Sequence, residues 1–281
     1  MWTAIAGLGV LAVLAALAAA GSWRWREAAR RVRAAMAETA GERASGTSRR
    51  GAANLPLPVQ RYLRRALPGG AAPIDGMRMR QEGSINLSET GERWTSFTAE
   101  QWTALRTPGF DWEARVRLMP GLTILVRDAY AGGEGITEAS ILGLWPLARV
   151  RGSGGIAEDQ LVRFLAEAPW YPVVLLPGGA VEWSEEGERS ARATIRQGSL
   201  TATATFVFGE DDFVLAVRCG ARGRTAGGER VPTPWQGRFG RYALRDGMWI
   251  PLEGEVSWIL PSGPHPYWRG RIAEIHYERA R

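Results

Sequence analysis

The sequence predicts a mainly β (α+β) protein, with one large curved antiparallel sheet of about eleven strands, one central amphipathic helix and an N-terminal transmembrane helix. Three observations predict this fold. From about residue 76 onward, apolar and polar residues alternate, as they do in strands with one buried face. Residues 158–168 space their apolar side chains as a helix does. Residues 1–23 carry no charge.

The uncharged segment from Met1 to Trp23 predicts a transmembrane helix. At ~1.5 Å per residue it reaches roughly 35 Å, enough for a hydrocarbon core of about 30 Å. Five arginines between Arg24 and Arg33, against one glutamate, form a basic flank of the kind that stays cytoplasmic. We therefore expect a single-pass protein of the cell membrane with its large domain in the cytoplasm. The alternatives are an extracytoplasmic domain and a signal peptide cleaved after Ala20.

Charge is concentrated beside this segment. The chain has a net charge of +6, and residues 24–65 hold eleven arginines and three glutamates, a balance of +8. The other 24 arginines and 26 acidic residues leave a balance of −2 for residues 66–281. A near-neutral domain on a basic stem indicates the membrane lipid bilayer as partner, through its anionic headgroups, and argues against nucleic acid. The alternative is that the arginines only fix the topology.

Residue usage excludes several chemistries. All 35 basic residues are arginine, so there is no lysine for a Schiff base or a phosphate loop. Cys219 is the only cysteine, which rules out an internal disulfide, and two histidines leave little for zinc. No G-x-S-x-G nucleophile motif occurs. We expect no cofactor and no metal, and no residue is assigned a catalytic role.

The chain divides into three segments: a membrane helix at residues 1–23, a basic juxtamembrane helix and linker at 24–54, and a single β-rich domain at 55–281. The linker, residues 40–54, is rich in glycine, serine and threonine and lacks apolar periodicity. The domain begins with a short helix that ends at Pro68 and places four apolar residues on one face: Val59, Tyr62, Leu63 and Leu67.

Within the domain, the clearest strand is 110–118, where five apolar residues alternate with four charged ones. The other strands are expected at 78–87, 93–104, 122–130, 135–142, 191–195, 201–208, 213–222, 236–244, 248–259 and 267–277. Short turns with Gly and Asp separate neighbouring strands and indicate antiparallel pairing. A closed barrel or a two-sheet sandwich is the structural alternative.

One helix interrupts the strands. Leu161, Phe164, Leu165 and Ala168 fall at i, i+3, i+4 and i+7, and Pro169 ends the run. An apolar stripe of this kind needs a sheet to pack on, so we expect the helix to cover part of the concave face.

Tryptophan supplies the main functional signal. The chain has thirteen, and most fall on predicted strands, where they can enclose an apolar ligand or fill an ordinary core. Two acids, Glu100 and Asp128, have apolar or aromatic neighbours and are candidates for buried, arginine-paired carboxylates. The predicted ligand-binding residues are Trp94, Glu100, Trp102, Phe110, Trp112, Asp128, Tyr130, Phe164, Trp170, Trp235, Trp258 and Trp268.

Paired carboxylates are the other candidate chemistry. Asp111 and Glu113 sit two apart on one strand, as do Glu253 and Glu255, so each pair shares a face and offers an acid and a base for glycoside hydrolysis. Arginines share those faces too, which favours ordinary solvated strand faces.

Six segments together resemble a bacterial family of uncharacterised, often membrane-anchored proteins, over about residues 55–278. They are Trp94–Gln101, Pro108–Arg115, Arg127–Tyr130, Leu165–Pro177, Pro234–Gly237 and Pro266–Arg271. The resemblance implies membership and supplies no mechanism. The order of strands, helix and strands is also similar to the curved half-barrel of bacterial lipoprotein carriers. Those carriers work outside the cytoplasm, in conflict with the orientation that the arginines predict.

Three functions are compatible with these features. The first is a membrane-tethered protein that binds a lipid or other apolar molecule on the concave face of the sheet, with the 161–168 helix as lid. The second is a scaffold that presents its sheet to a protein partner, which the sequence does not identify. The third is a carboxylate-dependent enzyme.

Overall fold

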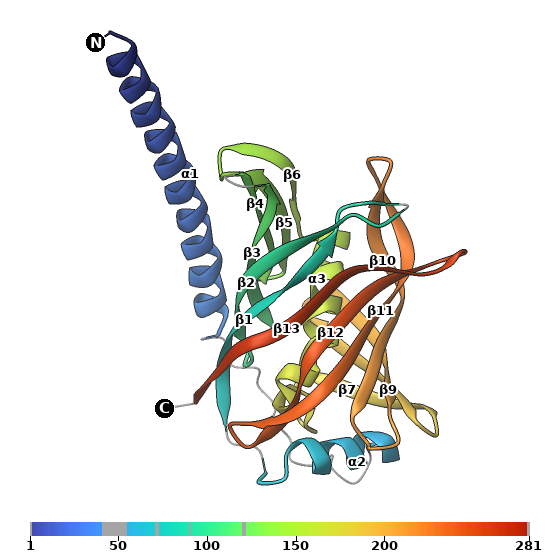
Figure 1. Ribbon diagram of the computed structural model, residues 1–281. Helices are drawn as coiled ribbons and strands as arrows, with labels where there is room; N and C mark the ends of the chain where they lie inside the picture. The colour runs from blue at the N-terminus through green and yellow to red at the C-terminus, as the bar shows by residue number, and fades with distance from the viewer. Residues whose placement is uncertain (1, 41–54, 71–72, 90, 120–121, 280–281) are drawn as a thin grey trace.

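The computed structural model describes residues 2–40, 55–70, 73–89, 91–119 and 122–279, without the side chains of residues 2–15 and 40. Its body is a single antiparallel sheet of thirteen strands (Figure 1). The strands are β1 (Ile74–Asn86), β2 (Trp94–Ala104), β3 (Gly109–Met119), β4 (Leu122–Ala131), β5 (Glu134–Ile141), β6 (Trp145–Gly152), β7 (Val181–Gly187), β8 (Ser190–Gln197), β9 (Leu200–Phe208), β10 (Val214–Ala226), β11 (Glu229–Arg245), β12 (Met248–Leu260) and β13 (Gly263–Arg279). The prediction of a mainly β fold is confirmed.

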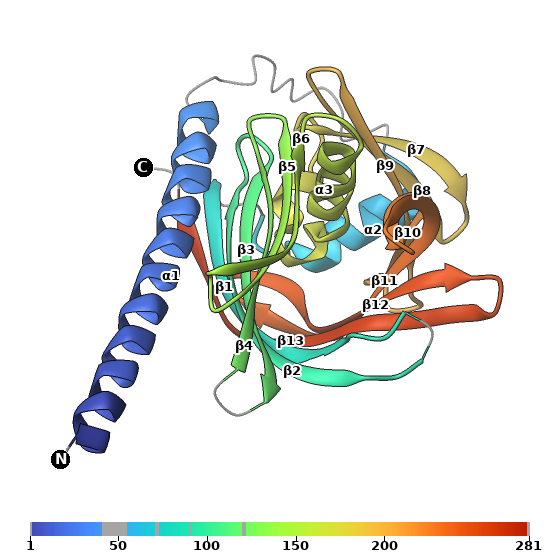
Figure 2. The same ribbon diagram turned by 90° about the horizontal axis from the view of Figure 1, so that it is seen from above.

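The sheet is open. Its order is β6-β5-β4-β3-β2-β1-β13-β12-β11-β10-β9-β8-β7, so β6 and β7 are its edges and β1 pairs with β13 at its centre. Seen from above, the sheet bends around a central helix (Figure 2). The alternatives of a closed barrel and a two-sheet sandwich are therefore wrong.

The described helices are α1 (Trp2–Ala40), α2 (Leu57–Ala66) and α3 (Gly155–Ala166), with two short 3-10 segments, η2 (Ala168–Trp170) and η3 (Pro172–Leu175). α3 is the predicted central helix, and Gly154 stands just before its first residue. Because α3, η2 and η3 connect the two edge strands, this connection has to cross the concave face. It brings α3 against strands of both halves, β4 and β5 on one side and β8 to β10 on the other.

Apolar and polar residues alternate along the strands, so that they lie on opposite faces of the sheet. On β3, Phe110, Trp112 and Ala114 are buried on the concave face, where they join the main hydrophobic core. Asp111 and Glu113 point to the outer face. α2 closes one end of the core, with Tyr62 fully buried and its ring 5.7 Å from that of Phe208.

α1 packs on the outer face of β2, β3 and β4 through its second half. Its close approach at Gly21 leaves no room for a Cβ, which would lie 2.3 Å from the Leu142 carbonyl oxygen. The predicted membrane segment, 1–23, falls largely on residues without described side chains, and the predicted linker lies outside the described residues beyond Ala40. Across the described part of the chain, no helix has the length and apolarity needed to cross a membrane.

Candidate functional site in the concave face

The concave face holds a hollow of about 220 Å³ beside the C-terminal end of α3. Its walls come from α3, η2 and seven strands. This volume lies below the roughly 300–1,000 Å³ usual for small-molecule sites. Its aromatic lining consists of Trp112, Trp170, Trp235, Phe239, Tyr267 and Trp268.

Two glycines make room for indoles that line the hollow. A Cβ on Gly270 would lie 2.5 Å from the Trp268 indole, and one on Gly237 would lie 3.2 Å from the Trp235 indole. The missing side chains let both indoles lie against the sheet rather than stand away from it. Trp170 is held by a hydrogen bond from its Nε1 to the Pro251 carbonyl oxygen, 3.1 Å away. The apolar wall is thus fixed by backbone contacts.

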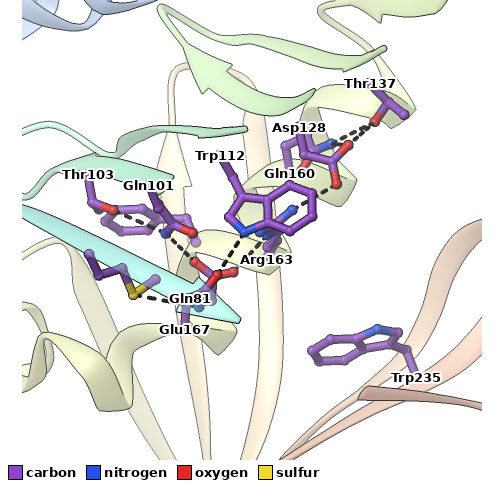
Figure 3. A network of polar contacts seen from close by, with 12 residues as sticks. Gln81, Gln101, Thr103, Trp112, Asp128, Thr137, Gln160, Arg163, Glu167 and Trp235 are labelled. Atoms are coloured by element: carbon purple, nitrogen blue, oxygen red, sulfur yellow. Dashed lines mark hydrogen bonds and ion pairs between the residues drawn. The ribbon is translucent and has the colours of Figure 1, made fainter. Parts of the chain in front are cut away.

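One wall of the hollow is polar and centres on Arg163 of α3 (Figure 3). Its Nη1 lies 2.7 Å from Asp128 Oδ2, its Nε lies 2.7 Å from Glu167 Oε1, and its guanidinium stacks 4.8 Å from the centroid of Trp112. We call Arg163, Asp128 and Glu167 the inner cluster. Burial alone lowers the pKa of Arg163, but Glu167 and Asp128 outweigh it and raise that pKa. The guanidinium therefore stays charged, and both carboxylates are committed to it.

Amide and hydroxyl groups fix the inner cluster in place. Thr137 Oγ1 donates to Asp128 Oδ1 over 2.6 Å, and Gln160 Nε2 donates to Thr137 Oγ1 over 2.9 Å. Gln101 Nε2 donates to Glu167 Oε2 over 2.6 Å. Trp112 Nε1 donates to Gln81 Oε1 over 2.8 Å (Figure 3). With so many partners, these side chains form a preorganised wall.

Five of the predicted ligand-binding residues line the hollow: Trp112, Asp128, Trp170, Trp235 and Trp268. Four others belong to the adjoining core and do not line it. They are Phe110, Tyr130, Phe164 and Trp258, the last stacked on Tyr267 with ring centroids 5.3 Å apart. Asp128 is the arginine-paired acid that its neighbours predicted.

The remaining three predicted residues lie on the outer face, because they alternate on β2 with Phe97, Ala99 and Gln101 of the concave face. Trp102 is covered by the Arg33 guanidinium, 3.2 Å from its ring centroid. Glu100 is exposed and pairs with Arg78 over 3.0 Å rather than being buried. Trp94 lies 4.4 Å from the Arg269 guanidinium.

Several lining residues were missed from the sequence. They are Gln81, Arg163, Glu167, Arg222, Phe239 and Tyr267. Two signals were available: Gln81 interrupts the apolar positions of β1, and Arg163 and Glu167 are spaced i, i+4.

The carboxylate pairs are held by arginines of the outer face. Asp111 is fully buried, with Oδ2 2.8 Å from Arg33 and Oδ1 3.2 Å from Arg127, and Glu113 lies 2.6 Å from Arg33. Trp25 of α1 donates from Nε1 to Glu113 over 2.8 Å. We call Arg33, Asp111, Glu113 and Arg127 the outer cluster. Burial, and then the charge of Glu113, raise the pKa of Asp111 to about 6 against the lowering effect of both arginines.

Glu253 and Glu255 are also ion-paired, at 2.9 Å with Arg241 and 2.8 Å with Arg269. Neither carboxylate pair therefore has two free groups facing a cavity, as glycoside hydrolysis needs. Within the described residues, no three metal-ligating side chains converge on one point.

The structure is an open antiparallel sheet with a hollow on its concave face, and the chain belongs to a family of unknown function, DUF6920, which matches residues 53–277. Membership of an uncharacterised family is therefore confirmed. No curated protein matches. A crystal structure of a LolA superfamily protein from Nitrosomonas europaea superposes with a TM-score of 0.39 and 8% identity, over 80% of this chain and 93% of that chain. A likeness this weak establishes neither a common fold nor a common ligand.

Proposed function

We propose that this protein binds a small apolar or amphipathic molecule in the hollow of the concave face. The observation that carries the proposal is the lining: six aromatic side chains with a few fixed polar groups at one wall. Small-molecule sites have this composition, and burying apolar surface contributes about 25 cal/mol per Å². At about 220 Å³ the hollow suits one short chain rather than a whole two-chain lipid.

The proposal includes a membrane tether formed by residues 1–23, with the domain on the cytoplasmic side. The uncharged sequence and its arginine flank support this orientation. Two exposed indoles, Trp23 and Trp145, flank the contact between α1 and the turn after β5, and indoles favour membrane interfaces. Carbonate extraction of membranes, with a C-terminal reporter of topology, tests both parts. Release by carbonate would refute the tether, and an extracytoplasmic reporter would reverse the orientation.

Ligand binding is tested with 1-octanol, a neutral single-chain probe, titrated by calorimetry into the full chain in lipid nanodiscs. Empty nanodiscs measure partition into lipid. We expect saturable binding that Trp235→Ala weakens about tenfold, since this truncation removes one wall. The matched control is Trp145→Ala, which alters an exposed indole far from the lining and leaves affinity unchanged. Equal effects of both variants, or the absence of saturable heat with every single-chain probe, would refute the function.

A further inference from the structure

Arg222 reaches the hollow because of an irregularity in β10. Cys219 stands opposite Trp235 on β11, but the next paired residue is Arg222, opposite Thr233, so the register shifts between Cys219 and Arg222. Residues opposite one another share a face, and Thr233 shares a face with Trp235. The bulge therefore places Arg222 on the concave face. With regular pairing, Arg222 would lie on the outer face. Bulges recur where a side chain is re-aimed next to a functional site.

Arg222 is a buried cation that has no anionic partner among the described residues. It is 9% exposed, its guanidinium lies 5.3 Å from the centroid of Trp235, and it lines the hollow. Among the described residues it forms no hydrogen bond or ion pair, and its Nε is buried without an acceptor. Buried charges in proteins are normally paired.

No carboxylate of the hollow is available to Arg222. Asp128 and Glu167 both bind Arg163, each at 2.7 Å. Glu255 binds Arg269 at 2.8 Å. The acids lining the hollow are thus engaged by other arginines, and Arg222, beside an aromatic wall, has no ion pair among the described residues. That combination fits an anion attached to an apolar body.

We propose that the hollow takes an anionic amphiphile, with its carboxylate or phosphate on Arg222 and its single short chain against Trp235 and Trp268. This rests on the ligand-binding function proposed above. A guanidinium receives either anion through two parallel hydrogen bonds. The volume of about 220 Å³ equals that of roughly seven liquid waters at ~30 Å³ each. A hollow of this size limits the ligand to one short hydrocarbon chain.

Three probes of equal chain length test the proposal on the full chain in nanodiscs: octanoate, octyl phosphate and 1-octanol. We expect at least one anion to bind tenfold or more tightly than octanol, and the better anion identifies the head group. Arg222→Gln removes this advantage and leaves the affinity for octanol unchanged. The matched control is Arg218→Gln, on the outer face of the same strand, where Arg218 donates to Gln236 over 2.9 Å. It leaves the preference intact.

A second measurement covers the case in which Arg222→Gln alters folding. Arg222→Met removes a buried charge that has no ion pair among the described residues, so we expect the melting temperature of the ligand-free protein to rise. A fall in that temperature would overturn the proposal, because Arg222 would then have a structural partner. Octanol binding without an anionic advantage, or an advantage that survives Arg222→Gln, would also overturn it while the ligand-binding function stands. Failure of all three probes would remove the ligand-binding function itself.

Discussion

The inner and outer clusters use the same residue types on opposite faces of neighbouring strands, yet they differ in what covers them. In the outer cluster, α1 covers the carboxylates: Arg33 forms ion pairs with Asp111 and Glu113, and the indole of Trp25 donates a hydrogen bond to Glu113. The inner cluster pairs its two carboxylates with the single arginine Arg163 and opens beside a hollow that Arg222 also lines. Residue chemistry alone therefore does not separate a covered cluster from one that faces a hollow, whereas the position of α1 does.

The largest effect is expected in the outer cluster. Arg127→Met leaves the buried Asp111 and the half-buried Glu113 with one arginine fewer, and breaking a buried ion pair costs about 3–5 kcal/mol. Urea unfolding of the full chain measures the loss. Arg149→Met is the control, because Arg149 is exposed and makes one pair, 3.1 Å from Glu138. We expect that control to cost less than ~0.5 kcal/mol. Similar costs for the two variants would end the distinction between the clusters.

A smaller effect is expected from pH. The pKa of Asp111 is raised from 3.8 to about 6 by burial, so the folded state holds this proton more tightly than the unfolded chain. Its contribution to stability is complete below about pH 4 and is lost as pH rises through about 6, a change of about 3 kcal/mol. The asparagine of the Asp111→Asn variant cannot ionise. The free energy of unfolding of this variant relative to the wild type should therefore rise by this amount between these pH values.

Unfolding free energies of the wild type and Asp111→Asn, measured from pH 4 to pH 7, give the difference directly. A constant difference would mean that Asp111 titrates normally. A difference of opposite sign would mean that Arg33 and Arg127 dominate over burial.

The smallest effect tests the hollow. Gly254→Ala adds a methyl group 3.4 Å from the Trp268 ring, an ordinary contact, so stability should stay within ~1 kcal/mol. The methyl group takes ligand space, and octanol affinity should fall by about 0.8 kcal/mol, the value of one methylene. Gly240→Ala, whose added Cβ meets nothing within 4 Å, is the control. Calorimetry that finds both variants equal to the wild type would show that the ligand lies elsewhere.

The sequence predicts the interior strands and fails at the edges. Eleven strands follow from alternation, but β6 and β7, the two edge strands, were missed. Every residue of β6 from Trp145 to Arg151 is exposed, so no buried face imposes a period of two. In β7 only Val181 is buried and Trp183 half-buried, and the other residues are exposed. An edge strand is held by its partner's backbone, and hydropathy does not record that pairing.

The site is predicted in part for a related reason. Alternation on β3 correctly separates Trp112 from Asp111, but the choice of concave or outer face depends on which side the helices pack. Trp102 was assigned to the site for its residue type, although Arg33 of α1 covers it. The alternation of apolar and polar residues does not predict the position of Arg222, because the bulge after Cys219 changes the face on which Arg222 lies. Irregular pairing is a property of two strands together, which one segment of sequence does not contain.

The central pairing of β1 with β13 has a consequence for how the chain folds. Arg80 and Glu274, 2.7 Å apart across these strands, are separated by 194 residues. The hairpins on each side close short loops, so both halves of the sheet can form while the seam between them is still open. Until it closes, β1 and β13 present unpaired edges of the kind that template aggregation. We therefore expect the joining of the two halves to be the slow step of folding.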